Sequence, residues 1–144
     1  MTPDEVVTLY WQRMQARDWA GVHALLAPDV VVEWPASGER FEGPDAVVGV
    51  NRAYPDGWTI RVQRVVAGPD GDTAVSEVEV PQDDVGTFAV ASFWQVRDGL
   101  ISRGREYWVT CGGEEPPPWR ARYATRWSGR PRDARPHLPV ADRT

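Results

Sequence analysis

The chain has 144 residues, a length typical of one domain with a buried core. Its first 110 residues hold 17 Asp and Glu against 9 Arg, which argues against a nucleic-acid partner because phosphate binding needs a basic surface. No apolar run approaches the roughly 20 residues of a membrane span, and the start of the sequence lacks a signal-peptide pattern, so we expect a cytoplasmic protein with no membrane partner.

The cysteine and histidine content is low. A single cysteine, Cys111, excludes an internal disulfide, and His23 and His137 stand apart from it at no metal-ligand spacing. We therefore expect no metal and no other cofactor. Eight tryptophans are many for this length and predict either an aromatic cavity or aromatic contact surfaces.

The N-terminal region predicts two helices. Thr2-Pro3-Asp4-Glu5 has the pattern of a capping box with proline at the first helical position. Helical spacing then places Tyr10 on or beside the apolar stripe, where its hydroxyl needs a partner. Asp18 ends this helix and can cap a second one, from Trp19 to Leu26.

The middle of the chain alternates strand and helix signals. A β-branched run from Val30 to Trp34 predicts a strand that Pro35 closes, and a polar turn region follows. Gly43-Pro44-Asp45 opens a third helix that runs to about Ala53. Three strand-like runs follow, at 58–66, 73–80 and 87–97.

A tight hairpin joins the last two predicted strands at Asp98-Gly99, a dipeptide that suits positive φ angles. Strand alternation then predicts one face with Leu100, Ser102, Gly104, Glu106 and Trp108, and an opposite face with Ile101, Arg103, Arg105, Tyr107 and Val109. If the face of Glu106 lines a cavity, partial burial raises the pKa of its carboxyl, as an acid/base group requires.

The composition changes after residue 110, which divides the chain into a domain at 1–110 and a Pro/Arg-rich extension at 111–144. Within the extension only WRARYATRW, Trp119 to Trp127, predicts a short helix. Its aromatic stripe of Trp119, Tyr123 and Trp127 favours docking, either as a lid across a pocket or as an arm on a partner subunit. From about residue 128 we expect disorder, so the extension is part docked and part disordered.

Three segments of the sequence resemble those of a known superfamily. They are the first predicted helix with the RDWAGVHALLAPDVVVEWP that follows it, then FEGPDAV, and then WQVRDGLISRGREYW. From residue 3 to about 110 the chain resembles the nuclear transport factor 2-like (NTF2-like) superfamily, in its SnoaL-like and ketosteroid-isomerase-like branch. The resemblance implies a cone-shaped α+β fold in which a bent antiparallel sheet packs on N-terminal helices, and a homodimer formed through the outer sheet face. This superfold hosts many chemistries and some proteins with none.

The resemblance also implies roles for single residues. Tyr10 falls where ketosteroid isomerases place an oxyanion-hole phenol, whereas Trp34 and Ser92 stand where those enzymes have carboxyl groups, which argues against the same steroid mechanism. The REYW sequence is similar to the final strand of limonene-epoxide-hydrolase-like members, with Glu106 at an acid position. Their other acid and arginine lie on the strand equivalent to VSEVEV, where Glu77 and Glu79 occur without an arginine.

We therefore predict a cofactor-independent acid/base enzyme that acts on a small hydrophobic molecule, as an isomerase, cyclase, dehydratase or epoxide hydrolase. Glu106 is the predicted acid or base, Tyr10 a hydrogen-bond donor, and Glu77 or Glu79 a second acid, although both glutamates can equally face solvent. The alternative is a non-catalytic ligand-binding or dimerisation domain. The predicted pocket-lining residues, several of which can equally form core, are Trp34, Asn51, Tyr54, Trp58, Phe88, Trp94 and Trp108.

Overall fold

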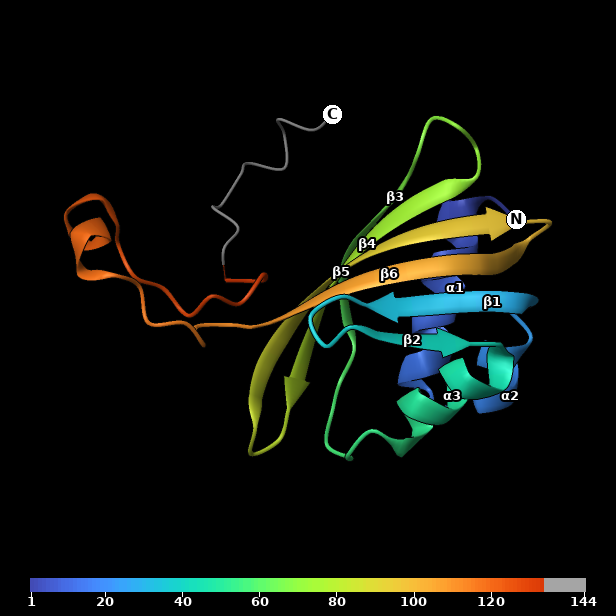
Figure 1. Ribbon diagram of the computed structural model, residues 1–144, viewed down its shortest axis with the longest axis horizontal. Helices are drawn as coiled ribbons and strands as arrows, with labels where there is room; N and C mark the ends of the chain where they lie inside the picture. The colour runs from blue at the N-terminus through green and yellow to red at the C-terminus, as the bar shows by residue number, and fades with distance from the viewer. Residues whose placement is uncertain (134–144) are drawn as a thin grey trace.

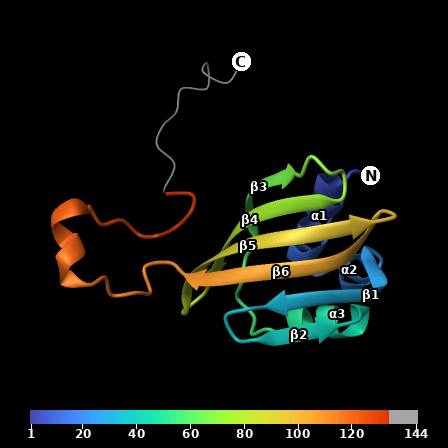
Figure 2. The ribbon, with the colours of Figure 1, turned by 45° about the horizontal axis from the view of Figure 1, so that its top comes forward.

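A computed structural model describes residues 1–133. Three helices cover one face of a six-stranded sheet and leave the other face uncovered (Figures 1 and 2). The helices are α1 (Pro3–Gln15), α2 (Trp19–His23) and α3 (Pro44–Ala53), and the strands are β1 (Leu26–Trp34), β2 (Glu39–Glu42), β3 (Arg61–Ala67), β4 (Thr73–Gln82), β5 (Gly86–Arg97) and β6 (Leu100–Thr110). The predicted α+β class, with a bent sheet packed on N-terminal helices, is confirmed.

The strand order in the sheet is β2-β1-β6-β5-β4-β3. All neighbouring pairs are antiparallel except β1 and β6, which run parallel, so the mostly antiparallel sheet contains one parallel pair. The edge strand β2 was not predicted, because the run SGERFEG is polar and reads as a turn. Its outward-facing residues are largely exposed, which explains the missing apolar pattern.

The N-terminal caps form as predicted. The Glu5 carboxylate accepts a hydrogen bond from the backbone N–H of Thr2 at 3.1 Å, and Asp18 accepts one from the N–H of Gly21 at 2.9 Å. Helix α2 is shorter than predicted because Leu26 already belongs to β1. None of the helices in residues 1–133 has the length and apolar content needed to span a membrane.

The hairpin between β5 and β6 turns at Asp98 and Gly99, whose φ angles of 55° and 74° are both positive, as predicted. Near the turn, however, the pairing shifts between Gln95 and Val96. This bulge accommodates one extra residue of β6, so Ile101 faces the core and is fully buried instead of lying on the outer face as simple alternation predicted.

Beyond the bulge the alternation holds, and β6 places Gly104, Glu106 and Trp108 on the face that the helices cover. The lack of a side chain at Gly104 is essential here, because a Cβ would lie 2.5 Å from a ring carbon of Trp94. The indole of Trp94 fills this space, is 1% exposed, and donates a hydrogen bond to Ser76 at 2.8 Å. The hydrophobic core therefore lies between the inner sheet face and α1.

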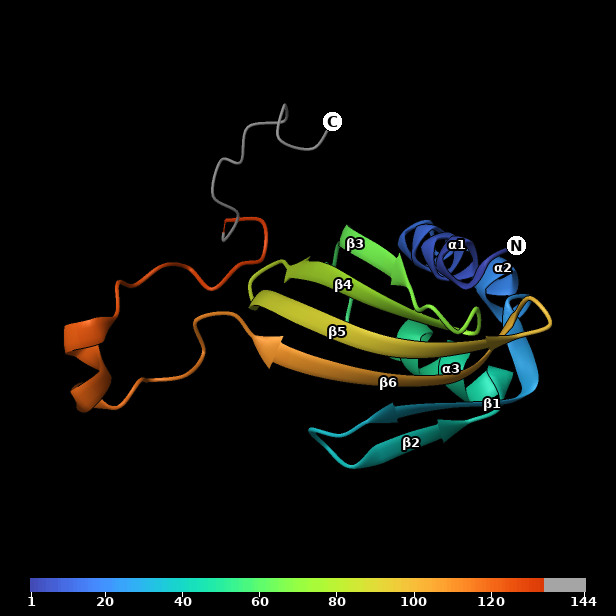
Figure 3. The same cartoon turned by 90° about the horizontal axis from the view of Figure 1, so that it is seen from above.

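Residues 111–130, which we call the C-terminal arm, form a loop that projects away from the end of β6 (Figures 1 and 3). Instead of the predicted helix over Trp119 to Trp127, the arm contains a 3-10 helix, η1 (Pro118–Tyr123). Trp119, Tyr123 and Trp127 are 70%, 76% and 55% exposed, so within residues 1–133 the aromatic stripe neither docks on the domain nor forms a lid across the chain's own pocket.

The end of the arm returns to the sheet. Arg130 forms an ion pair with Glu79, and the expectation of disorder therefore does not hold at residues 128–133. The rest of that expectation, together with His137, concerns residues 134–144, which lie outside the described part of the chain.

Candidate active site

Glu106 is a buried carboxyl group on the inner face of the sheet. Glu106 is 3% exposed, and its two carboxylate oxygens accept hydrogen bonds, one from the Trp34 indole at 3.1 Å and the other from the Ser92 hydroxyl at 2.8 Å. Ser92 faces Glu106 directly across the β5–β6 ladder. Burial raises the pKa of Glu106 above its ordinary value, while the hydrogen bonds from Ser92 and Trp34 oppose that rise. The predicted inward orientation of Glu106 agrees with this geometry.

Tyr10 lies behind this carboxyl group on α1. It is 1% exposed, and its ring packs between Trp11 and Trp94 at centroid distances of 5.2 and 5.1 Å. Burial, and then the negative charge of Glu106, raise the pKa of the Tyr10 hydroxyl well above its ordinary value, so it remains a neutral donor.

Most of the predicted pocket-lining aromatic residues surround a cleft of about 300 Å³, which we call the mouth cleft. Trp108 is at the centre of the aromatic group, with the rings of Trp34, Tyr54 and Phe88 at centroid distances of 5.8, 6.3 and 6.2 Å. The Nε1 of Trp108 is buried and has no hydrogen-bond partner within residues 1–133. The remaining lining residues are Ala36, Ser37, Glu39, Val109 and Thr110.

A second, much smaller hollow of about 20 Å³ lies next to it and shares Tyr54 and Trp108. Such a volume holds about one water molecule. Asn51 and Trp58 line this hollow, but the Asn51 amide donates to the carbonyl oxygen of Val47 at 2.8 Å. Trp94 lines neither hollow and belongs to the core. Aromatic side chains thus fill most of the inner space that the sequence predicted as a cavity.

Trp34 separates the mouth cleft from the buried carboxyl group. Its side chain contributes to the cleft wall, and its indole N–H donates to Glu106, which does not itself line the cleft. A molecule in the cleft would therefore meet the Trp34 ring before it met the acid. Because Trp34 is the last residue of β1, it lies directly before the turn to the edge strand β2.

Glu77 and Glu79 lie on the opposite face of the sheet from Glu106, since Val78 and Val80 take the inner positions of β4. The prediction that one of them acts as a second acid beside Glu106 is therefore wrong, and the alternative, that the valines face the core, is right. Glu77 pairs with Arg64 at 3.2 Å. Unexpectedly for an outward position, Glu79 is fully buried.

The burial of Glu79 results from two arginines. Arg130 of the C-terminal arm holds both carboxylate oxygens, at 3.1 and 3.2 Å, and Arg61 of β3 approaches to 3.5 Å. Sequence reasoning missed the Arg130 contact because 51 residues separate the two partners. The positive charge of the extension was the only signal that could have indicated it.

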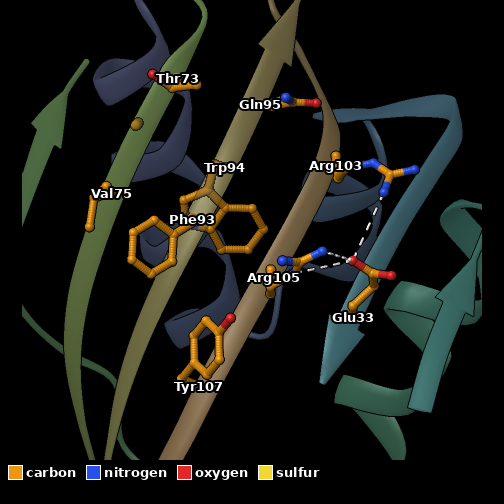
Figure 4. Close-up of a pocket in the computed structure, with 10 residues that line it drawn as sticks. Glu33, Thr73, Val75, Phe93, Trp94, Gln95, Arg103, Arg105 and Tyr107 are labelled. Atoms are coloured by element: carbon orange, nitrogen blue, oxygen red, sulfur yellow. Dashed lines mark hydrogen bonds and ion pairs between the residues drawn. The ribbon is translucent and has the colours of Figure 1, made fainter. Parts of the chain in front are cut away.

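A hollow of about 660 Å³, larger than the mouth cleft, lies on the outer face of the sheet and was also missed (Figure 4). We call it the outer groove; Phe93 and Tyr107 supply its aromatic rings, and Arg103 and Arg105 border it beside Glu33. Hydrogen bonds from Arg40 and Arg105 hold the pKa of Glu33 below its ordinary value. A carboxylate so neutralised is a poor proton acceptor, so we do not assign acid/base chemistry to this groove despite its size.

Within residues 1–133, no three or more His, Cys, Asp and Glu side chains form a group that could hold a metal ion. His23 of α2 contacts Asp45 at 3.1 Å on the protein surface. For chemistry, the inner side of the sheet offers a buried carboxyl group, a neutral phenol and an aromatic cleft.

Comparison with solved structures identifies similar folds. A candidate ketosteroid isomerase from Kribbella flavida DSM 17836 superimposes with a TM-score of 0.78 and 31% sequence identity, over 88% of this chain and 91% of that chain. An LEH-like epoxide hydrolase from M. tuberculosis has a TM-score of 0.62 at 23% identity, over 75% of this chain and 84% of that one. A candidate polyketide cyclase from Xanthomonas campestris pv. campestris has a TM-score of 0.60 at 24% identity, over 72% and 87%.

None of the curated proteins compared matches the sequence. The sequence pattern of the SnoaL-like domain, in contrast, matches residues 7–104, which include most of α1, all of α2 and α3, and most of the sheet. With the fold described above and the 31% identity to the Kribbella protein, this match is decisive. The chain belongs to the SnoaL-like domain family of the NTF2-like superfamily.

Proposed function

We propose that this protein is a cofactor-independent acid/base enzyme that acts on a small, mostly apolar molecule. The observation that carries the proposal is Glu106, a carboxyl group whose pKa burial raises, placed next to an aromatic cleft. A raised pKa brings the carboxyl closer to neutrality, as suits a group that takes and returns a proton in one cycle.

The two donors to Glu106 add support. Trp34 and Ser92 stand at the positions where the resemblance places the carboxyl groups of ketosteroid isomerases, and both donate hydrogen bonds to Glu106. The acid thus comes from β6, while the side chains at these two positions orient it. This arrangement is consistent with relatives described as a candidate isomerase and a candidate cyclase.

For an isomerisation, Glu106 in its carboxylate form removes a proton from a carbon next to a carbonyl group of the bound molecule. The electrons of the broken C–H bond form the enolate, whose oxygen gains negative charge. The Tyr10 hydroxyl, which stays neutral because its pKa is raised, donates a hydrogen bond to that oxygen. Glu106 then returns the proton to a different carbon. Cyclisation, dehydration and epoxide hydration use the same acid.

Access to the acid requires Trp34 to move. The mouth cleft, at about 300 Å³, is at the lower end of the volumes that hold small molecules. Rotation of the Trp34 ring would break its bond to Glu106 and join the cleft to the carboxyl group. The Trp34 ring also packs against Phe41 and Trp108, at centroid distances of 4.6 and 5.8 Å, so the movement would have to displace these contacts as well.

A proton-exchange assay tests the proposal without knowledge of the natural substrate. A panel of cyclic ketones is incubated with the protein in D₂O, and deuterium incorporation next to the carbonyl group is followed by NMR. Exchange should fall by about 10²- to 10⁴-fold in E106Q. E33Q, which removes a carboxylate outside the cleft, is the matched control and should exchange at the wild-type rate. Equal rates in wild type and E106Q for every exchanging ketone would exclude the catalytic role.

The proposal extends to partners and location. We propose a small hydrophobic ligand, no nucleic-acid or membrane partner, and a cytoplasmic protein that pairs as a homodimer through its outer sheet face. The exposed Phe93 and Tyr107, 51% and 43% exposed, support the pairing, since they border the outer groove. Sedimentation of the wild type and of F93S/Y107S measures the balance between monomer and dimer, and the variant should be more monomeric. A wild-type protein that is monomeric at all concentrations would refute the pairing.

A second candidate function is a non-catalytic ligand-binding or dimerisation domain. The observation that favours it is the filled interior, where both Glu106 oxygens already accept bonds and the adjacent hollow measures about 20 Å³. Quenching of tryptophan emission by a hydrophobic dye separates the alternatives. Dye binding without any ketone exchange would favour a binding domain, whereas neither response would favour a purely structural domain.

A further inference from the structure

The C-terminal arm is a loop closed at its base. A Cβ at Gly129 would lie 2.6 Å from the backbone nitrogen of Gly112, so the outgoing and returning chain segments touch at this point. Directly after it, Arg130 holds both oxygens of the fully buried Glu79. The base of the arm is therefore anchored to the sheet, and the 3-10 helix at its tip is held away from the domain (Figures 1 and 3).

The tip of the arm has an unusual surface. Trp119, Tyr123 and Trp127 are each more than half exposed, and within residues 1–133 the rings of Trp119 and Tyr123 contact Arg120 and Arg122 of the arm itself, at 5.8 and 5.1 Å from the ring centroids. Between residues 116 and 127 the arm holds three arginines and no acidic residue, a charge of +3. Large aromatic side chains held in water next to positive charge are typical of a contact surface whose partner is apolar and acidic.

The mouth cleft has the complementary chemistry. Its walls are aromatic, its lining includes the carboxylate of Glu39, and no basic side chain is among its lining residues. The first 110 residues as a whole carry a charge of −8. The outer groove is bordered by Arg103 and Arg105, and a neighbouring hollow of about 470 Å³ is lined by Arg40 and Arg105, so both would repel the arginines of the arm. Charge thus selects the mouth cleft over the outer groove.

The arm does not reach the cleft of its own chain. Val109 and Thr110 line the cleft, and the arm leaves the domain directly after them, with its tip directed away from the sheet (Figure 3). A second copy of the chain offers the same cleft without that restriction. In a symmetric pair, the contact that one arm makes with the partner is repeated by the other arm.

We propose that two copies of this chain exchange arms, and that the tip of each arm covers the mouth cleft of the other copy. The aromatic rings of the arm then complete the open side of the cleft, while the arm arginines lie near Glu39. Each cleft is therefore built from two chains. The proposal goes beyond the proposed chemistry, since it does not depend on a catalytic Glu106.

Intermolecular disulfide trapping tests this exchange. Because Cys111 is the only cysteine, C111S provides a cysteine-free background. Two variants are prepared in it, Y123C at the arm tip and S37C in the cleft lining, and they are mixed under mild oxidation. Neither variant can form a disulfide within one chain. We expect a Y123C–S37C heterodimer, identified by mass, and much less product when V75C, which lines the outer groove, replaces S37C.

A second measurement keeps the test independent of cysteine reactivity. Sedimentation compares wild type with W119A/Y123A/W127A, whose substitutions lie outside the core. The triple variant should associate more weakly, so its dimers should separate into monomers at a higher protein concentration than those of the wild type. The mixed cross-link should also form with E106Q in both chains, which separates failure of this proposal from failure of the enzyme proposal. A preferential Y123C–V75C product, or an unchanged association of the triple variant together with no S37C product, would overturn the arm exchange.

Discussion

The substitution E106Q isolates the effect of ionising the buried carboxyl group. Glutamine keeps a carbonyl oxygen that can accept from Trp34 and gains an amide that can donate to the Ser92 hydroxyl, so both contacts of the wild type can be retained. The shape of the side chain is also preserved. What the variant lacks is the ability to acquire a negative charge in a buried position.

Burial raises the pKa of Glu106 in the folded protein, so the unfolded chain ionises this group at lower pH than the folded protein does. Below the ordinary glutamate pKa both states are protonated, and the group contributes no pH dependence. As the pH rises from there through the folded pKa, the wild type loses stability by about 1.4 kcal/mol for each unit by which the pKa is raised. E106Q should not show this loss.

Urea unfolding of both proteins, from below the ordinary glutamate pKa to pH of about 8, measures the difference in unfolding free energy. We expect the unfolding free energy of E106Q to increase relative to that of the wild type as the pH rises. E33Q is a control for which the opposite change is expected. Hydrogen bonds from Arg40 and Arg105 lower the pKa of Glu33, so the unfolding free energy of the wild type should increase relative to that of E33Q over the same pH range. A constant difference between wild type and E106Q at every pH would refute the burial argument.

Two core substitutions test the packing that supports the site. In G104A the new Cβ would meet the Trp94 ring at 2.5 Å, and overpacking should cost about 1 to 3 kcal/mol in urea unfolding. G49A is its control, because no atom lies within 4 Å of a Cβ there and a helical alanine should stabilise by about 0.5 to 1 kcal/mol; equal effects of the two would contradict the contact. In S76A the indoles of Trp11 and Trp94, which donate to Ser76 at 3.1 and 2.8 Å, lose a buried acceptor. We expect a loss of about 1 to 3 kcal/mol per donor and a change in tryptophan emission, and an S76A protein as stable as wild type would show that neither bond matters.

Local chemistry explains the parts of the fold that the sequence predicted well. The Thr2 to Glu5 capping box and the Asp98-Gly99 turn depend only on neighbouring residues, and both form as predicted. The inward orientation of Glu106 likewise follows from its spacing to Gly104 and Trp108 on one strand. These signals are short in range, so the sequence alone contains them.

Features that depend on distant residues could not be predicted in the same way. The bulge that turns Ile101 into the core arises from pairing with β5, and strict alternation within β6 gives no sign of it. The parallel pairing of β1 with β6 likewise involves strands that many residues separate. Sequence alternation therefore gave the correct face only where the ladder was regular.

The candidate site shows the same limit. The spacing in SEVEV left two faces open for Glu79, and the structure shows it outward yet buried, because Arg130 returns from the C-terminal arm to cover it. The aromatic residues predicted to line a cavity instead fill much of it, since their rings pack against Trp108. Composition indicated an aromatic interior but gave no measure of the space left within it.

The central claim is that Glu106 is a buried carboxyl group with a raised proton affinity, held by Trp34 and Ser92 beside the mouth cleft. Its pKa can be measured directly by following the side-chain carboxyl carbon of ¹³C-labelled glutamate by NMR across a pH titration, with E106Q used to assign the signal. We predict an inflection for Glu106 clearly above that of an ordinary glutamate. An inflection at or below the ordinary value would contradict the account.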